Sequence, residues 1–142
     1  MALNILVVDD SSIMRKMIIK GLRLSGLPLG ELYEAGNGKE ALQIIGDEWI
    51  DVALVDINMP VMTGDELIDA LRADPETAKF PIIVVSSESS EKRIELLKAK
   101  GTEFVHKPFT PESVREAIAE LTGVTYEHAS EAEDIQGGGL DF

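Results

Sequence analysis

Three carboxylates in this sequence follow directly after short apolar runs. Asp56 ends the run that begins at Asp51, and Asp9 and Asp10 follow the run Ile5–Val8. A short apolar run that stops at a carboxylate is typical of a buried parallel strand, which delivers that side chain to the rim of an open α/β sheet. Carboxylates gathered at one rim repel one another and need a cation. The spacing therefore predicts an acidic site that binds a positive ion.

Two further apolar runs end in groups that complement these carboxylates. Ser86 follows Ile82–Val85, and Lys107 follows the run that begins at Phe104. A carboxylate attacks phosphorus only when its charge and those of the phosphoryl oxygens are screened, which Mg²⁺ held by oxygen ligands can do. A lysine ammonium and a serine hydroxyl would neutralise and bind the remaining phosphoryl oxygens. The predicted chemistry is phosphoryl transfer to Asp56.

Strand and helix patterns alternate along the chain and explain how these groups would meet. The apolar runs predict strands at Asn4–Asp9, Leu32–Ala35, Val52–Asp56, Ile82–Ser86 and Glu103–Val105. Helical periodicity predicts helices at Ser12–Ser25, Gly38–Glu48, Gly64–Ala73, Ser89–Lys100 and Pro111–Leu121. Right-handed crossovers between parallel strands then predict a doubly wound (βα)₅ three-layer sandwich of the flavodoxin-like class. The strand order 2-1-3-4-5 would place strands 1 and 3 side by side.

The first predicted helix carries apolar residues on one stripe. Ile13, Met17, Gly21 and Leu24 recur at helical spacing, and we expect this stripe to face the sheet. Trp49 lies near a predicted loop, where we expect it to contribute to packing.

Composition limits the class of protein. The 142 residues suit one domain of ordinary size, and no apolar run approaches the ~20 residues of a membrane span. A formal net charge of −13 disfavours nucleic acid as a partner. The absence of cysteine excludes thiolate chemistry, and the N-terminus lacks a signal-peptide pattern, so we expect a cytoplasmic protein without membrane contact.

The periodic pattern fades near residue 122, which divides the chain into a domain over residues 1–122 and an acidic tail over residues 123–142. The tail contains no Lys or Arg, but Ile135, Leu140 and Phe142 are apolar. We expect it to be a docking segment, either for another copy of the chain, which would give self-association, or for the domain's own output face.

Across residues 2–121 these motifs resemble the receiver domain of two-component response regulators. The resemblance rests on the acidic pair Asp9-Asp10, on Asp56 at the phospho-acceptor position, and on Lys107-Pro108. It implies that Asp10, Asp56 and the backbone carbonyl of Asn58 ligate Mg²⁺, with Asp9 acting through water. It also leads us to expect a cis peptide bond between Lys107 and Pro108.

The same resemblance assigns roles to four more groups. Ser86 matches the family's switch Ser/Thr, and Phe104 lies where the family places an aromatic rotamer switch. Asn58 and Glu88, two positions beyond Asp56 and Ser86, would flank the phosphoryl group and control access of the hydrolytic water. Together with the run from Asp9 to Lys16, they are similar to the stand-alone chemotaxis regulators of that family.

The resemblance implies a single-domain response regulator that a histidine kinase phosphorylates on Asp56 with Mg²⁺. Phosphorylation would switch a protein-binding surface in chemotaxis signalling, with the flagellar motor switch as target and a phosphatase as a further partner. Such a switch is not a classical enzyme. A receiver that acts as a phosphate sink or adaptor without a motor target remains an alternative. A magnesium phosphatase with Asp56 as nucleophile is a third, although the sequence shows neither a cap insertion nor a well-placed general acid.

Overall fold

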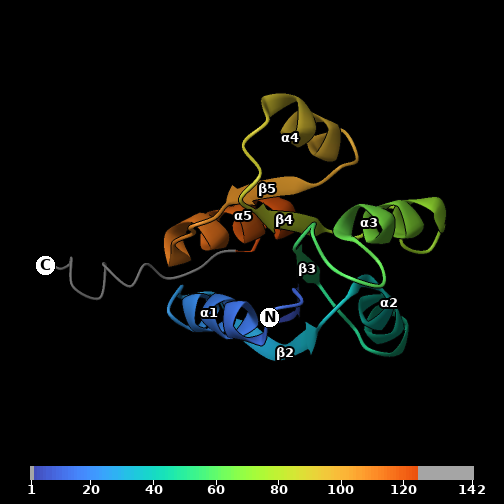
Figure 1. Cartoon of the computed structure of the whole chain (residues 1–142). Helices are drawn as coiled ribbons and strands as arrows, with labels where there is room; N and C mark the ends of the chain where they lie inside the picture. Colours follow the sequence, from blue (N-terminus) through green and yellow to red (C-terminus); the bar gives the residue numbers. More distant parts are fainter. Residues whose placement is uncertain (1, 125–142) are drawn as a thin grey trace, which may run out of the picture.

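Five strands and five helices alternate along residues 2–124, the part of the chain that the computed structural model describes (Figure 1). The strands are β1 (Leu3–Val8), β2 (Leu29–Ala35), β3 (Val52–Val55), β4 (Ile82–Ser86) and β5 (Glu103–His106). The helices are α1 (Ser12–Arg23), α2 (Gly38–Asp47), α3 (Gly64–Ala73), α4 (Glu91–Lys98) and α5 (Pro111–Thr122). All neighbouring strands are parallel, in the order β2-β1-β3-β4-β5. The predicted doubly wound sheet is confirmed.

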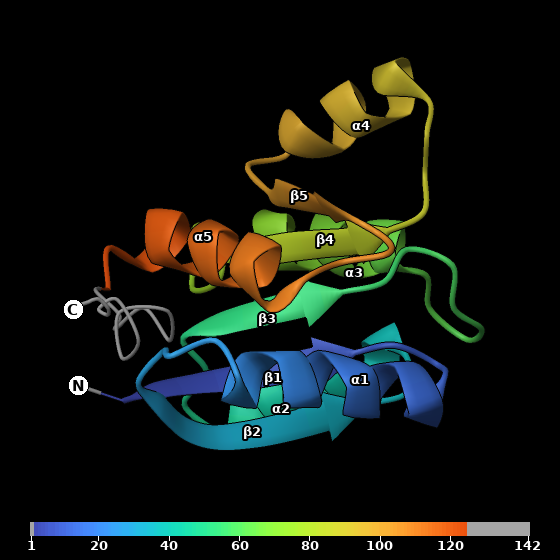
Figure 2. The same cartoon turned by 90° about the vertical axis from the view of Figure 1, so that its left-hand side faces the viewer.

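The sheet has an apolar layer on each face because successive strand side chains point to opposite sides. Leu6, Ala53 and Val84 belong to the cluster on the side of α2, α3 and α4. Leu54 and Val85, one position further along their strands, belong to the cluster under α1 and α5. Figure 2 shows α1 and α5 in front of the sheet. The strands of the centre are therefore buried on both faces, which is why they read as continuous apolar runs.

Polar side chains define where the helices begin. Ser11, Asn37, Thr63, Ser90 and Thr110 each accept a hydrogen bond from a backbone N–H of the first turn that follows. The expected start of the fourth helix at Ser89 was two residues early, because Ser90 is the capping residue. None of the helices in residues 2–124 is long and apolar enough to cross a bilayer.

The predicted apolar stripe of α1 is wrong. Ile13, Met17 and Leu24 are 72%, 53% and 59% exposed, whereas Ile18 and Leu22 are buried against the sheet. The buried face is rotated from the predicted one by about one residue, since both sets recur at helical spacing and periodicity alone cannot choose between them. Of the predicted stripe, only Gly21 is buried.

Polar contacts join α3 to α4 and to the turn before β5. Asp65 in the first turn of α3 forms an ion pair with Arg93 of α4, and Asp69 pairs with the Lys100 ammonium at 2.8 Å. Further along α3, the Arg72 guanidinium donates to the carbonyl oxygens of Lys100 at 2.7 Å and Gly101 at 3.1 Å. Apolar packing of α4 is limited, because Leu97 is the only buried residue of this helix.

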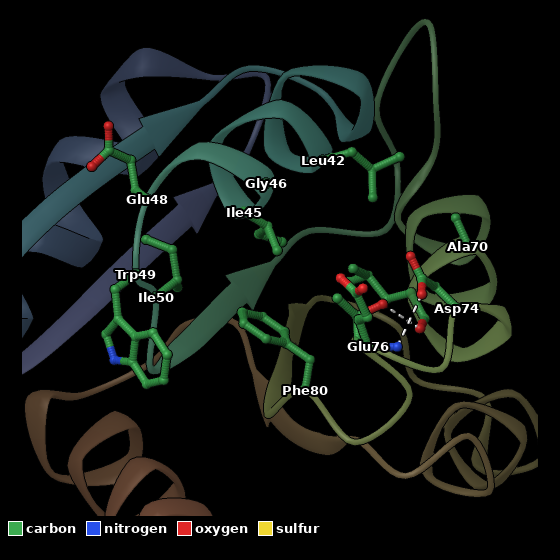
Figure 3. A pocket seen from close by; sticks show the side chains of 12 residues that line it. Leu42, Ile45, Gly46, Glu48, Trp49, Ile50, Ala70, Asp74, Glu76 and Phe80 are labelled. Atoms are coloured by element: carbon green, nitrogen blue, oxygen red, sulfur yellow. Dashed lines mark hydrogen bonds between the residues drawn. The ribbon is translucent and has the colours of Figure 1, made fainter.

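A pocket of about 410 Å³ lies between the C-terminal part of α2 and the loop after α3, at the amino edge of the sheet (Figure 3). Glu48, Asp74 and Glu76 make it acidic. Trp49 also lines it but is 77% exposed, with its indole N–H donating to Asp51 Oδ1 at 3.0 Å. The expectation that Trp49 packs into the protein was therefore wrong.

Candidate functional site

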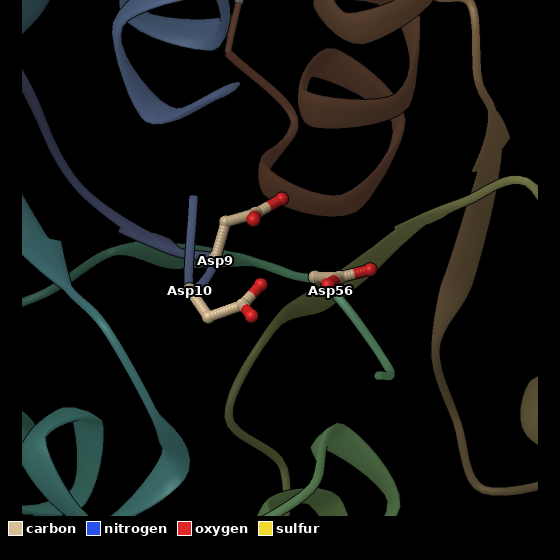
Figure 4. A group of neighbouring side chains, drawn as sticks. All are labelled: Asp9, Asp10 and Asp56. Atoms are coloured by element: carbon tan, nitrogen blue, oxygen red, sulfur yellow. The ribbon is translucent and has the colours of Figure 1, made fainter. Parts of the chain in front are cut away.

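The carboxyl ends of β1 and β3 bring three aspartates together. Val8 and Val55 are direct neighbours in the sheet, and the Asp56 N–H donates to the Val8 carbonyl at 2.9 Å. Each of Asp9, Asp10 and Asp56 presents a carboxylate oxygen within 4.8 Å of the other two (Figure 4). Asp9 and Asp56 are 2% and 8% exposed, whereas Asp10 is exposed. Two of the three carboxylates are therefore buried, and the third is open to solvent.

Lys107 brings a positive charge to these carboxylates from the end of β5. Its backbone N–H donates to the Ser86 carbonyl at 2.9 Å, which extends the pairing of β4 and β5 past their last residues. Its ammonium nitrogen lies 3.4 Å from Asp9 Oδ2 and 3.5 Å from Asp56 Oδ1. The following peptide bond, to Pro108, is cis, as expected. One lysine thus faces two buried carboxylates, and the cluster keeps an excess of negative charge.

The ionisation of Asp56 reflects this environment. Burial raises the pKa of the Asp56 carboxyl above its ordinary value, because the charged form loses solvation. The charge of Lys107 opposes the rise in pKa, and the charge of Asp9 adds to it. The charged form of Asp56 therefore destabilises the folded chain when no cation is bound.

An Asp56→Asn variant is expected to be more stable than the wild type at pH 7 in the presence of a chelator, by on the order of 1 kcal/mol. Because the pKa of Asp56 is higher in the folded chain than in the unfolded one, the folded state gains stability as the pH falls through the window between these two values. The advantage of the variant should therefore shrink between pH 7 and about pH 4.

Urea unfolding of both chains across this pH range measures the effect. Asp47→Asn is the matched control, since Asp47 is an exposed aspartate at the end of α2. An Asp56→Asn advantage that grows toward acid would contradict the assignment.

The other predicted residues lie around the cluster, and their roles stay predictions. Ser86 is buried at the end of β4, where its hydroxyl accepts a hydrogen bond from the Glu88 N–H at 3.0 Å. The Glu88 carboxylate accepts from the Ser90 N–H at 3.1 Å, so in this structure it is directed to the start of α4. Asn58 is exposed in the loop after β3. Phe104 pairs with Val84 across β4 and β5 and lies edge-on to the His106 ring.

Two residues that were not predicted from the sequence hold the backbone next to the carboxylates in place. Arg15 of α1 donates to the Asp9 carbonyl oxygen at 2.6 Å and to Glu34 Oε1 at 2.8 Å, and so fixes the backbone of Asp9. Gly64 begins α3, and its N–H donates to the Ile57 carbonyl at 2.9 Å. The signal for this turn was present, since Thr63 and Glu66 form a capping box and have the spacing of that motif.

The loop between Asp56 and α3 also contains an unusual backbone conformation. Val61 has φ of 69° and is 76% exposed. A left-handed conformation costs an L-residue about 1–2 kcal/mol, and a β-branched side chain adopts it rarely. The loop that carries Asn58 is therefore held by its surroundings rather than by the preference of Val61.

Replacing Gly64 by alanine should destabilise the fold by about 2–3 kcal/mol and displace the acceptor. A Cβ atom there would lie 2.3 Å from the Asp56 carbonyl oxygen and 2.8 Å from the Ile57 Cα atom, and both are backbone atoms that cannot rotate away.

Thermal unfolding measures this loss. Gly46→Ala is the control, because a Cβ at Gly46 of α2 meets nothing within 4 Å and should stabilise the helix by about 0.5 kcal/mol. Equal stability of the Gly64→Ala and Gly46→Ala variants would show that the loop between Asp56 and α3 can move freely. It would contradict the role of Gly64 in positioning Asp56.

The donor set fits a hard divalent cation. Asp9, Asp10 and Asp56 supply oxygen ligands within reach of a single ion, and Mg²⁺ binds through one or two carboxylates while it keeps several waters. The exposure of Asp10 leaves room for those waters. The cluster contains neither sulfur nor imidazole, which zinc and copper sites favour.

Comparison with known proteins agrees with this geometry. The family model described as the response regulator receiver domain matches residues 5–119. The chain is 38% identical over 123 residues to a chemotaxis protein CheY homolog of Campylobacter jejuni, covering 85% of this chain and 93% of the relative. It is 38% identical over 120 residues to the chemotaxis protein CheY of Pseudomonas aeruginosa, covering 84% and 95% of the two chains.

Solved structures of response regulators superpose on this chain. The chemotaxis protein CheY4 of Vibrio cholerae superposes with a TM-score of 0.74 at 34% identity, over 85% of this chain and 99% of its own. The receiver domain of the Francisella response regulator 1452 superposes with a TM-score of 0.75 at 25% identity, over 85% and 97% of the two chains.

Proposed function

This chain belongs to the response regulator receiver family, and from that premise we propose that it is a phosphoryl-activated switch with Asp56 as phospho-acceptor. Its relatives include chemotaxis proteins, so its coarse role as a CheY-like receiver domain follows from family membership. The observation that carries the finer proposal is the arrangement of Lys107, whose ammonium lies 3.4 Å and 3.5 Å from the carboxylates of Asp9 and Asp56.

The proposed reaction transfers a phosphoryl group from a histidine kinase. The phosphorus–nitrogen bond of a phosphohistidine breaks, an Asp56 oxygen forms an acyl phosphate, and the imidazole nitrogen takes a proton. Asp10, Asp56 and the Asn58 carbonyl would hold Mg²⁺, with Asp9 acting through water, and the bound ion would neutralise charge on the phosphoryl oxygens. Lys107 offers its ammonium to a phosphoryl oxygen and thereby exchanges a carboxylate partner for a phosphate partner.

The response to phosphorylation is proposed to begin at Ser86. Its hydroxyl, which accepts from the Glu88 N–H, would donate its proton to a phosphoryl oxygen. Glu88 is linked through Ser90 to the first turn of α4, so a displacement of Ser86 reaches that helix within a few residues. Phe104, whose ring packs with the cluster on the α4 face, would repack with α4. Phosphorylation then shifts the population of two states of this surface.

The partners follow from this scheme. We propose that the protein is cytoplasmic and that a histidine kinase is its phosphoryl donor. A flagellar motor switch protein is the proposed target of the α4, β5 and α5 surface, and a phosphatase would act on the acyl phosphate. Asn58 and Glu88 are proposed to limit access of water. Domain limits of 1–122 and a separate tail of 123–142 belong to this proposal, and self-association through the tail lies outside the residues that the structure describes.

Binding to the motor switch protein, measured by calorimetry with and without beryllofluoride as phosphoryl mimic, tests the function. We expect binding to tighten at least tenfold with the mimic and Mg²⁺, and this gain to be absent in Asp56→Asn. Kinase-dependent phosphorylation without any binding to the motor protein would instead identify a phosphate sink. Turnover of small phosphomonoesters would identify a phosphatase.

A further inference from the structure

A second pocket at the amino edge of the sheet is lined by basic and apolar residues. It has a volume of about 450 Å³ and lies between the C-terminal part of α3, the start of β4, the turn before β5 and the end of α5. Its walls combine cationic and apolar groups: Arg72, Lys79, Lys100, Phe80, Pro81 and Leu121. None of the described residues that line this pocket is acidic.

The cations of this pocket are only partly neutralised. The Arg72 guanidinium donates to the carbonyl oxygens of Lys100, Gly101 and Phe80, at 2.7, 3.1 and 2.9 Å. These partners satisfy its hydrogen bonds but carry no formal charge, and desolvation lowers the pKa of Arg72. Lys100 does have a carboxylate partner, Asp69, at 2.8 Å. Lys79 is exposed and forms no ion pair within residues 2–124. The pocket therefore attracts an anionic ligand with apolar side chains.

The chain itself contains a segment of this chemistry. Residues 125–142 carry five acidic residues, no Lys or Arg, and end in Leu140-Asp141-Phe142. The described chain ends within a few residues of the pocket, because Leu121 lines the pocket and Val124 is the last described residue before this segment. Eighteen residues reach up to about 60 Å when extended, so length does not restrict the contact.

We propose that Leu140, Asp141 and Phe142 dock into the pocket formed by Arg72, Lys79 and Lys100 of the same chain. Phe142 and Leu140 would cover the apolar surface of Phe80 and Leu121, and Asp141 would face Lys79. The other pocket at this edge, lined by Glu48, Asp74 and Glu76, repels such a segment (Figure 3). A tether of this length gives an effective concentration near 1 mM, so a segment with Kd of about 0.1 mM would be docked about ten times more often than free.

Disulfide trapping in the full-length chain tests this contact. The protein has no cysteine, so the substitutions Ala78→Cys and Gly139→Cys introduce the only two cysteines in the chain. They leave the side chains of Leu140, Asp141 and Phe142 intact. Ala78 lines the pocket. The control pair, Gly46→Cys with Gly139→Cys, places the first cysteine at the acidic pocket of the same edge.

We expect the Ala78/Gly139 pair to form an intramolecular disulfide about tenfold faster than the control pair under mild oxidation, followed by gel mobility and intact mass. Adding Leu140→Ser and Phe142→Ser, or Lys79→Glu, to the first pair should slow it to the control rate. Equal rates for the two pairs would overturn the proposal. Disulfides that form only between two chains would also overturn it, and would identify a second copy as the source of the segment.

Discussion

An Asp56→Asn chain incubated with a small phosphodonor and Mg²⁺ is expected to gain no phosphoryl mass, whereas the wild type gains one phosphoryl group. The amide has no anionic oxygen to attack phosphorus, and the neighbouring carboxylates cannot replace it. Asp9 is held by its hydrogen bond from the Ser11 N–H at 2.9 Å and by the Lys107 ammonium, and Asp10 lies one residue further along at the exposed side. Intact mass spectrometry measures the result directly.

Asp47→Asn is the control for this experiment, because it removes an exposed aspartate that lies outside the cluster and should leave phosphorylation unchanged. A second comparison separates the acceptor from the metal ligands. Asp10→Asn retains the nucleophile, so its phosphorylation should be slowed but should recover as Mg²⁺ is raised. An unchanged gain of mass in Asp56→Asn would refute the assignment of the acceptor.

Replacing Lys107 by methionine is expected to slow phosphorylation from a small donor by about 10²–10³-fold. Methionine keeps most of the length of the side chain but removes the ammonium that lies 3.4–3.5 Å from Asp9 and Asp56. The loss of one charged donor from a partly buried site has an effect of this size on transition-state charge. The cluster also becomes more negative, so the variant should bind Mg²⁺ more tightly than the wild type.

The two effects have opposite signs, and this makes the prediction specific. A misfolded variant would lose both phosphorylation and Mg²⁺ binding, whereas the expected variant loses only the first. Mg²⁺ affinity can be followed by calorimetry. Lys39→Met, at an exposed position of α2, is the control. A Lys107→Met chain that is phosphorylated at the wild-type rate would exclude Lys107 as the counter-charge.

Sequence reasoning predicted the sheet and the cluster because both depend on where apolar runs stop. The run before Asp56 and the run before Asp9 are continuous, since their strands are buried on both faces, and right-handed crossovers leave few orders for five parallel strands. The carboxylates and Lys107 were then placed at one edge by topology alone. The contact distances support this placement, although the role of each residue stays a prediction.

The buried face of α1 and the role of Gly64 were not predicted correctly, because both depend on packing that a pattern of residue types does not determine. The stripe on α1 was ambiguous because Ile13 and Met17 alternate with Met14 and Ile18 at the same helical spacing, and only the packed structure identifies Ile18 as buried. Gly64 was missed because its importance is the 2.3 Å separation between a hypothetical Cβ and a backbone oxygen. Such a separation depends on how the chain returns after the strand, which residue type does not encode.

The acidic cluster and the basic pocket lie at opposite edges of one sheet, joined by strands of four and five residues, and share no residue. A phosphoryl group at one edge therefore cannot sterically exclude a peptide at the other. If phosphorylation displaces α4, it also displaces the turn that follows this helix, where the Lys100 and Gly101 carbonyl oxygens accept hydrogen bonds from Arg72. The affinity of the basic pocket for its ligand then changes. By thermodynamic reciprocity, whatever occupies that pocket must then shift the equilibrium for phosphorylation of Asp56 by the same factor.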